Sequence, residues 1–407
     1  MTAVTAGTQA GVPMLTAQEA VAVARALAEQ FAEGAAARDC RRTLPYEEVG
    51  ALARSGLLAI TVPPTYGGPG LPAATVAEVF RLLGWGDPNL AQIPHSHVVY
   101  LNQLRLRGTR AQQRRIYAEV LAGKMVANAQ SEFDTKHVRD VTTTLRPAGE
   151  GRWLLTGEKF YCTGSLFADY LAVLAHRGTD GPLAVAWVPS DAPGVERIDD
   201  WDAIGQRTTG SGTVRLRDVA VTDDGVTGFS ETFEEPTTYG AFAQLLHAAL
   251  DAGIARRALD EAAELVRTRS RPYPDAVATY GVERAADDPL TVRAFGEMEL
   301  AVRGAEALLA EAARVLDAAE AALDEESAGA ASLAVAAARA STTAVSVEVT
   351  SRLFDVAGTR AALAPLDLDR HWRNARTHTL HDPAAWKVQH LGRWAVGGVL
   401  PPRHGQL

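Results

Sequence analysis

The spacing of hydrophobic positions changes twice along the chain and divides it into three regions. Residues 15–125 carry apolar side chains at every third or fourth position, beginning directly after Thr16 with AQEAVAVARALAEQFAEGA. This period predicts helices, and Thr16 suits the N-cap of the first one. Pro45 suits the first turn of a further helix that continues through Ala53. We therefore expect an N-terminal helical domain.

In the second region, residues 126–233, the apolar period falls to two. Four short runs are rich in β-branched or aromatic residues and bounded by Gly, Asp and Pro: WLLTGEKFYCTG, DYLAVLAHRG, PLAVAWVPS and GTVRLRDVAVTD. They predict a central antiparallel β-barrel. Helical spacing returns in residues 234–407, in long segments rich in Ala, Leu and Glu, and predicts a C-terminal helical bundle. The expected fold class is α+β, in the order helices, strands, helices.

Two segments lie outside these periodic patterns. Residues 1–14 lack a basic stretch followed by an apolar one, and we expect them to form a disordered tail rather than a signal peptide. Residues 269–289 contain several prolines and aspartates. They predict a long loop between helices, and loops of that length often carry function.

Composition limits the class of partner. The 407 residues are 47% apolar and 22% charged with a net charge of -9, which disfavours nucleic acid and anionic membranes because those partners need clustered Lys and Arg. The only cysteines, Cys40 and Cys162, cannot form a disulfide framework or a four-Cys zinc site. No run of about 18 apolar residues occurs. We expect a cytoplasmic protein that binds a small molecule.

The glycine-rich motifs do not predict a nicotinamide site. GGPG at 67–70 lies in a turn and GSG at 210–212 lies between strands, whereas such a site needs a strand, GxGxxG and a helix in succession. If the protein carries out redox chemistry, its electrons must therefore come from another source.

The greatest density of chemically active side chains lies in DRHWRNARTHTLHDPAAWK, residues 369–387. Four polar residues spaced 4, 4 and 3 apart predict one stripe on a helix, facing a ligand or another subunit. They are Arg370, Asn374, His378 and His381. Histidine exchanges protons near neutral pH, which favours catalysis by the two histidines. The alternatives are compensation of the helix dipole and a metal site, for which only Asp382 offers a third ligand; we expect no metal.

Three motifs give the chain a resemblance to the acyl-CoA dehydrogenase superfamily over nearly its whole length. GLLAITVPPTYGGPGL is similar to the N-terminal signature of that family, GEKFYCTGSLFADYLAVLA to the strand pair beside the flavin ring, and GQRTTGSGTVRLRDVAV to the barrel-closing strand. RHWRNARTHTLHDP, together with NAQSE and RSRPY, resembles the flavin-dependent monooxygenase branch that includes dibenzothiophene monooxygenase and sulfur-acquisition oxidoreductases.

This resemblance implies a two-component monooxygenase. Reduced FMN and O2 would form a C4a-hydroperoxyflavin that oxygenates a small organic substrate at sulfur. The FMN would be reduced by a separate NAD(P)H-dependent flavin reductase, and the enzyme would be a homotetramer. FMN is expected rather than FAD, because the family motifs RxxFG and GGxGY that reach the adenosine half of FAD appear here only as RSRPYPDAVATYG and DVAGTR.

The resemblance also assigns residues. His381, His378 and Thr163 are the expected catalytic groups, with Thr163 in place of a serine. The residues expected to bind FMN are Asn128, Ser131, Tyr161, Thr163, Arg271, Thr359, Arg360 and His381. Arg271 and Arg360 would hold the phosphate, because a guanidinium group matches two phosphate oxygens. His95 and His97 are expected to close the substrate pocket, with simple packing at a helix end as the alternative.

Two other activities remain open. An acyl-CoA dehydrogenase would use Asp382 as its base, but this carboxylate is one methylene shorter than the glutamate of those enzymes and precedes Pro383, which also marks a helix end. An N-oxygenase of an amine or amino sugar would share the flavin chemistry and differ only in substrate. A helical scaffold that has lost its flavin is disfavoured by the presence of Thr163, His378 and His381.

Overall fold

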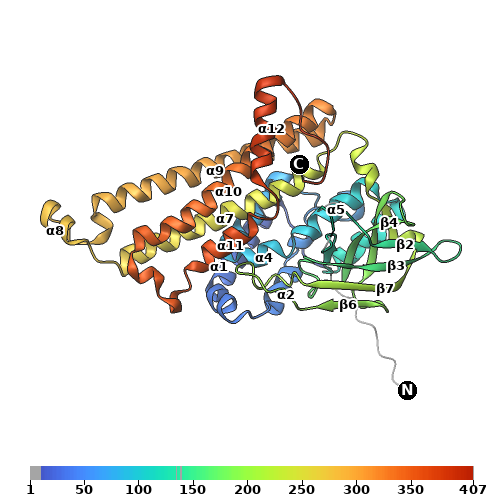
Figure 1. Ribbon diagram of the computed structural model, residues 1–407, viewed down its shortest axis with the longest axis horizontal. Helices are drawn as coiled ribbons and strands as arrows, with labels where there is room; N and C mark the ends of the chain where they lie inside the picture. Colours follow the sequence, from blue (N-terminus) through green and yellow to red (C-terminus); the bar gives the residue numbers. More distant parts are fainter. Residues whose placement is uncertain (1–10, 134, 138–139, 407) are drawn as a thin grey trace, which may run out of the picture.

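The computed structural model describes residues 11–133, 135–137 and 140–406 (Figure 1). Helices from both ends of the chain flank a curled sheet, which confirms the expected α+β order of helices, strands and helices. The long C-terminal helices run side by side along the molecule, and the sheet lies at one end of them (Figure 1).

The N-terminal region consists of helices, as predicted. They are α1 (Ala17–Arg41), α2 (Tyr46–Arg54), α3 (Ala73–Gly86), α4 (Pro88–Gln92), α5 (His95–Arg107) and α6 (Arg110–Leu121). A capping box starts α1: Glu19 N donates to Thr16 Oγ1 at 3.3 Å, and Thr16 N donates to the Glu19 carboxylate at 2.8 Å.

The prediction of a disordered tail is wrong for residues 11–14. Val12 N donates to Leu121 O at 2.9 Å, and the Val12 side chain packs against the core. The end of α6 leaves this carbonyl free to accept, so the incoming chain is held in place. Residues 1–10, the rest of the expected tail, lie outside the described residues.

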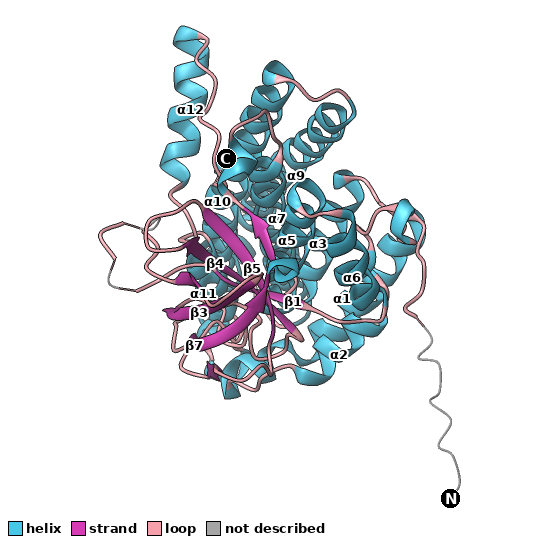
Figure 2. Cartoon of the chain, turned by 90° about the vertical axis from the view of Figure 1, so that its right-hand side faces the viewer, coloured by secondary structure: helices cyan, strands magenta, loops and turns pink. Residues whose placement is uncertain are grey.

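Eight strands form the central sheet. They are β1 (Val126–Ala129), β2 (Thr144–Pro147), β3 (Arg152–Lys159), β4 (Tyr170–Arg177), β5 (Leu183–Pro189), β6 (Val195–Ile198), β7 (Thr213–Thr222) and β8 (Val226–Gly228). The order is β6-β7-β3-β2-β4-β5-β8, with β1 added to β4. Figure 2 shows the curled sheet facing the viewer. The pairs β1–β4 and β2–β4 are parallel, so the sheet is mixed and curled, not the antiparallel barrel expected from the sequence.

In the middle of the sheet, buried and exposed side chains do not alternate along the strands as the sequence period of two predicts. Five successive side chains are buried in each of β4 and β5. A strand buried on both faces loses the alternation that a half-exposed strand shows. These strands are therefore recognisable in the sequence by their β-branched and apolar runs rather than by alternation.

The C-terminal region is built on three long helices. The helices of the region are α7 (Tyr239–Thr268), α8 (Pro274–Tyr280), α9 (Pro289–Ala321), α10 (Glu325–Ala357), α11 (Asp369–His378) and α12 (Ala384–Gly397). Their many alanines allow α10 to pack closely between α7 and α9. By length and composition α10 could cross a membrane, but here it is a core helix that carries the buried Arg339.

Two predictions in this region need correction. Residues 269–289 are not simply a loop, since α8 and a short 3-10 turn lie within them. The helix rich in histidine and arginine ends at His378, four residues earlier than Pro383 suggested, because the chain turns through residues 379–383 before α12. His381 therefore lies beyond the helix and does not extend its polar stripe.

Glycines set the position of α7, the helix behind the site described below. A Cβ atom on Gly84 of α3 would lie 2.9 Å from Leu250 O, and a Cβ atom on Gly253 of α7 would overlap the backbone of α3. The two helices thus cross with their backbones nearly in contact, which only glycine permits. This crossing fixes the turn of α7 that carries Asp251.

Candidate functional site

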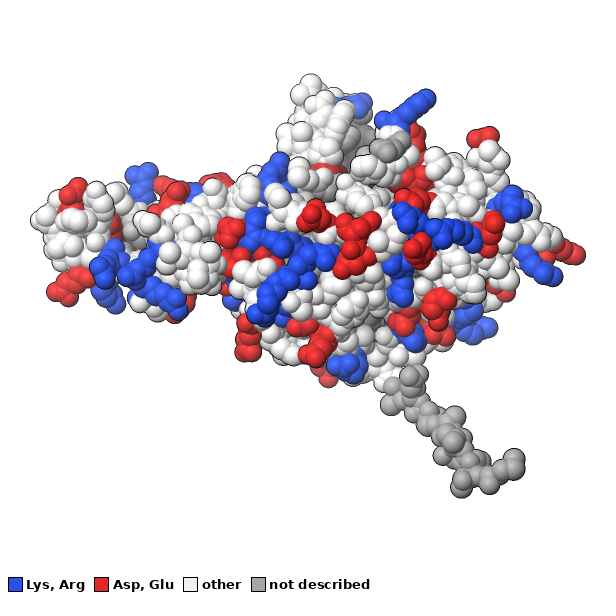
Figure 3. All heavy atoms as spheres, turned by 60° about the horizontal axis from the view of Figure 1, so that its bottom comes forward, with Lys and Arg blue, Asp and Glu red and all other residues white. Residues whose placement is uncertain are grey.

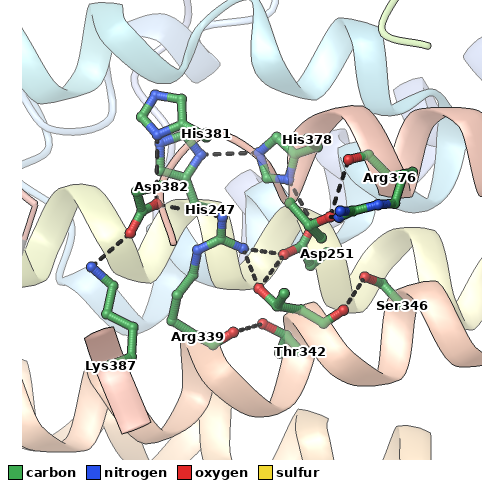
Figure 4. Close-up of polar contacts among 12 residues, drawn as sticks. His247, Asp251, Arg339, Thr342, Ser346, Arg376, His378, His381, Asp382 and Lys387 are labelled. Carbon is green, nitrogen blue, oxygen red and sulfur yellow. Dashed lines mark hydrogen bonds and ion pairs between the residues drawn. The ribbon is translucent and has the colours of Figure 1, made fainter. Parts of the chain in front are cut away.

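Helix α11 ends against α7 at a cluster of histidines (Figure 4). His378, in the last turn of α11, lies with Nδ1 2.6 Å from Asp251 Oδ1 and Nε2 3.0 Å from His247 Nδ1. His247 and Asp251 are four residues apart on α7, so they occupy the same face and contact His378 together.

Two further imidazoles complete this histidine cluster, which consists of His95, His247, His378 and His381. His95 begins α5 and stacks on His247 with ring centroids 3.9 Å apart, while its Nε2 lies 3.0 Å from Ala243 O. The His381 ring lies 4.1 Å from that of His247. The side chain of His381 is 47% exposed, whereas the other three histidines are buried. His381 is therefore the member that can meet a ligand.

A buried ionic network lies next to the histidine cluster and joins α7, α10 and the turn before α12. Arg339 of α10 pairs with Asp251, and its second terminal nitrogen lies 3.6 Å from Asp382 Oδ1. Lys387 of α12 lies 2.7 Å from Asp382 Oδ2. All four charged side chains are buried. Removing one partner would leave a buried charge uncompensated, at a cost of about 3–5 kcal/mol, so this network fixes the turn that carries His381.

The charges of the cluster follow from burial. Burial lowers the pKa of His95 to about 3 and places the pKa values of His247 and His378 below the usual value for histidine. The three buried rings are therefore neutral at pH 7. Burial alone would raise the pKa of Asp251, but the Arg339 charge and His378 outweigh it and lower that pKa, so Asp251 is ionised.

A second group of predicted residues lies between β1 and the segment after β3. Phe160 N donates to Ser131 O at 2.9 Å, and Thr163 Oγ1 lies 2.8 Å from Ser211 Oγ. Tyr161 has the unusual φ of 56° and exposes 47% of its surface. Asn128 Oδ1 is buried without a hydrogen-bond partner.

The hydroxyl groups around Thr163 form an ordered chain. Thr209 Oγ1 donates to Gln206 O at 2.9 Å and lies 2.6 Å from Ser211 Oγ. The one hydroxyl proton of Thr209 is used in the bond to Gln206, so Ser211 must donate to Thr209. The proton of Ser211 is then used as well, and Thr163 must donate to Ser211. The remaining lone pairs of Thr163 Oγ1 are therefore free to accept a hydrogen bond from a ligand.

The segment before β7 joins this second group to α11. Gln206 N donates to Asn374 Oδ1 at 2.6 Å, and Thr208 N donates to Asn89 Oδ1 at 3.1 Å. One loop thus connects Thr163, through Ser211, to the helix that ends at His378. The histidine cluster and the Thr163 group belong to one region of the fold.

The expected polar stripe on α11 exists, but it does not face a ligand or a second subunit. Arg370 Nη2 lies 2.6 Å from Glu261 of α7, and Asn374 binds Gln206 N. The stripe serves to attach α11 to its own chain, because buried polar groups need partners.

His97 also requires a correction. Its Nε2 lies 2.8 Å from Leu58 O, and its Nδ1 accepts from Val126 N at 3.0 Å. Both ring nitrogens are thus used by the backbone, the side chain is fully buried, and the packing alternative holds for His97. His95, by contrast, belongs to the histidine cluster.

Three of the residues expected to bind FMN lie away from the histidine cluster. Arg271, Thr359 and Arg360 are exposed, and Arg360 donates to the carbonyl of Arg269 at the end of α7. This end carries α8 and lies opposite the sheet in Figure 1. Within one chain these residues do not approach the histidine cluster.

Sequence reasoning missed His247, Asp251 and Arg339. A signal was present for the first two, because HAALD places a histidine and an aspartate four apart on an otherwise apolar helix. For Arg339 the signal was weaker: it is the single arginine in the alanine-rich stretch before Thr342. Among the described residues, no group of three or more His, Cys, Asp or Glu side chains could hold a metal ion.

The hydrogen-bond acceptors and the aromatic surface around Thr163 fit a flavin ring. Asn128 Oδ1 is a buried acceptor without a partner and Thr163 Oγ1 has free lone pairs, so both can accept from a ring N–H or from a group on the ring. Tyr161 contacts Trp201 with centroids 5.8 Å apart, which supplies aromatic surface beside them. All of these features are present within a single copy of the chain.

Comparison with known proteins agrees with the geometry. Residues 16–124, 129–219 and 245–385 match the families described as "Acyl-CoA dehydrogenase, N-terminal domain", "Acyl-CoA dehydrogenase, middle domain" and "Acyl-CoA dehydrogenase, C-terminal domain". The three matches follow the helix, sheet and helix regions of the fold.

Individual relatives narrow the assignment. Dibenzothiophene monooxygenase of Rhodococcus qingshengii is 34% identical over 396 residues, which cover 94% of each chain. The probable FMNH2-dependent monooxygenase SfnC of Pseudomonas putida is 34% identical, covering 94% of this chain and 96% of SfnC. The crystal structure of FMN-bound TdsC from Paenibacillus sp. A11-2 matches with a TM-score of 0.90 and 33% sequence identity. The match covers 95% of this chain and 100% of TdsC. The chain belongs to the acyl-CoA dehydrogenase family, in its branch of flavin-dependent monooxygenases.

Proposed function

We propose that this protein is a monooxygenase that uses reduced FMN and O2 to oxygenate a small organic substrate at sulfur. The observation that carries the proposal is the single exposed histidine, His381, on a neutral buried histidine cluster, adjoined by the Thr163 group. The named relatives act on dibenzothiophene or depend on FMNH2. Reduced FMN supplies the oxygen activation, and a separate NAD(P)H-dependent flavin reductase supplies reduced FMN.

The residues of this chain bind the ring and manage a proton. Asn128, Ser131 and Tyr161 hold the ring edge, and Thr163 accepts a hydrogen bond through its free lone pairs. His381 holds or delivers one proton at the reacting edge, with His378 behind it. His95 and His247 lie buried behind His381. Burial lowers their pKa values, so both rings stay neutral, and their side chains exclude water from this side of the site.

The acyl-CoA dehydrogenase alternative is disfavoured by the state of Asp382. Its carboxylate is 4% exposed and paired with Arg339 and Lys387. Burial would raise the pKa of Asp382, but His381, whose Nδ1 lies 3.6 Å from Asp382 Oδ1, and the two cations lower it overall. A carboxylate held ionised by two cations is a poor base for a carbon acid.

A homotetramer is part of the proposal. Arg271, Thr359 and Arg360 can reach the flavin bound at the histidine cluster only if they come from a second copy of the chain. The projecting helix α12 exposes Trp386, Trp394 and other apolar residues that a second copy would cover (Figure 2). A cytoplasmic location is also part of the proposal. On the face drawn in Figure 3, Arg and Lys side chains are interspersed with Asp and Glu.

The test is oxygen incorporation by the purified protein with FMN, NADH and a flavin reductase under 18O2. Thioethers, thiophenes and sulfoxides form one panel, amines and amino sugars another, and an acyl-CoA a third. We expect 18O-labelled sulfoxide or sulfone by mass spectrometry. Labelled nitrogen products, or acyl-CoA oxidation without labelled product, would overturn the assignment to sulfur.

Two variants sharpen this experiment. His381→Ala should lower labelled product by about a hundredfold or more while hydrogen peroxide accumulates, since it removes the proton-handling group. His176→Gln, near the end of strand β4 and away from the cluster, should retain wild-type product. Equal loss in both variants would remove His381 from the mechanism.

A further inference from the structure

Behind His378, Asp251 and Arg339 have no role in the reaction as described so far, and His247 has only been said to keep the site neutral and closed to water. His247 and Asp251 of α7 and Arg339 of α10 are each 0–1% exposed. They are connected in order, because Arg339 pairs with Asp251, Asp251 contacts His378 Nδ1, and His378 Nε2 contacts His247 Nδ1 (Figure 4). A buried polar chain of this length is costly unless every member is satisfied.

The partners determine where each proton lies. Asp251 is ionised beside Arg339 and can only accept, so His378 Nδ1 must carry a proton and donate to it at 2.6 Å. The neutral His378 ring then has a bare Nε2. At 3.0 Å that nitrogen needs a donor, and His247 Nδ1 is the only one facing it among the described residues. His247 must therefore carry its proton on Nδ1.

The His247 ring also supports its neighbours through its faces and edge. It lies 3.9 Å from the His95 ring and 4.1 Å from the His381 ring, centroid to centroid. Its Nε2 is buried and accepts no hydrogen bond in the described structure. One side chain thus touches all three other members of the cluster.

We propose that Asp251 and His247 are positioning residues that fix the Nδ1–H tautomer of His378 and, through the His247 ring, the orientation of His381. This inference rests on the proposed function, because His381 is the proton-handling group there. Asp251 orients His378 from one side and His247 from the other, so His378 cannot rotate or exchange tautomers without breaking a buried hydrogen bond.

Two substitutions of His247 separate positioning from packing. His247→Asn places an amide N–H where Nδ1 was and keeps the donor to His378, whereas His247→Phe keeps the ring and removes both nitrogens. We expect His247→Phe to lower the ratio of oxygenated product to hydrogen peroxide by about tenfold or more, and His247→Asn to stay within about threefold of wild type. The opposite order would assign His247 to packing and overturn the proposal.

The ratio is measured in a single turnover with protein in excess over reduced FMN, so it does not depend on the amount of folded protein. Solid-state NMR of the flavin-free protein labelled with 15N-histidine gives a second measurement, with His378 assigned by its absence in His378→Gln. We expect a neutral Nδ1–H tautomer for His378 in wild type and a changed one in Asp251→Asn. A charged or Nε2–H His378 in wild type would overturn the proposal.

The NMR measurement also distinguishes this inference from the proposed function. If wild-type protein yields no oxygenated sulfur product, the function fails, while the tautomer of His378 in the flavin-free protein still decides the arrangement of protons. If product forms and the tautomer differs from Nδ1–H, the function stands and the positioning role fails.

Discussion

At the scale of single residues, burial decides which histidines can carry charge. His95, His97, His247 and His378 are buried, and burial lowers their pKa values, to about 3 for His95 and about 4 for His97. His381 has the same chemistry but 47% exposure. Position in the fold, and not residue type, therefore separates the four buried imidazoles from the one that is open to a ligand.

The buried histidines predict a loss of stability in acid. A histidine whose pKa is lowered by folding binds fewer protons folded than unfolded, so its contribution is complete above the unfolded value near 6.5 and falls as the pH decreases toward the folded value. For His97 the expected slope is about 1.4 kcal/mol per pH unit between about 6.5 and 4.5.

Urea unfolding of the flavin-free protein at several pH values measures this slope. His97→Gln should lower stability at pH 7 and make the pH dependence shallower by about 1.4 kcal/mol per unit. An unchanged slope would mean that His97 titrates alike in both states and would contradict the pKa argument.

At the scale of elements, the crossing of α3 and α7 positions the histidine cluster. Gly84 and Gly253 allow the two backbones to approach, and Asp251 lies only two residues before Gly253. α10 fixes the opposite side of α7 through Arg339. The chemistry at the end of α11 thus depends on how closely three helices pack.

The expected effect of Gly253→Ala follows from that crossing. The added methyl group would overlap the α3 backbone, so we expect destabilisation of about 1–3 kcal/mol and a lower product-to-peroxide ratio, because α7 must shift with Asp251. Thermal unfolding and single-turnover product analysis measure the two effects.

Gly304→Ala in α9 is the control for this substitution. A Cβ atom at Gly304 meets no heavy atom within 4 Å, so alanine should stabilise the helix by about 0.5–1 kcal/mol. Equal unfolding midpoints for the two variants would show that the α3–α7 crossing tolerates a methyl group.

At the scale of the whole molecule, the residues assigned to one flavin lie far apart within one chain. The histidine cluster lies where α11 ends against α7, whereas Arg271 and Arg360 lie beyond the far end of α7, the end that carries α8 in Figure 1. If both groups bind the same flavin, each site combines two copies of the chain.

Mixed oligomers test this arrangement. Copies carrying His381→Ala and copies carrying Arg271→Ala, purified together through two different tags, should regain about half of the wild-type product per mixed pair, since one of the two sites in a symmetric pair then has no defect. Each variant alone should be inactive at limiting FMN. Mixtures with no more activity than the separate variants would place both groups in one chain and contradict the shared site.

The sequence alone determined the order of helices, strands and helices and the cap at Thr16, and it singled out His378 and His381 as candidates, because periodicity, capping and unusual local density are properties of neighbouring residues. It did not determine the parallel pairings of β4, the buried roles of His97 and Arg370, or the partnership of His247, Asp251 and Arg339 with His378. Those contacts join residues 29 or more positions apart, and only tertiary packing brings them together and sets their charge.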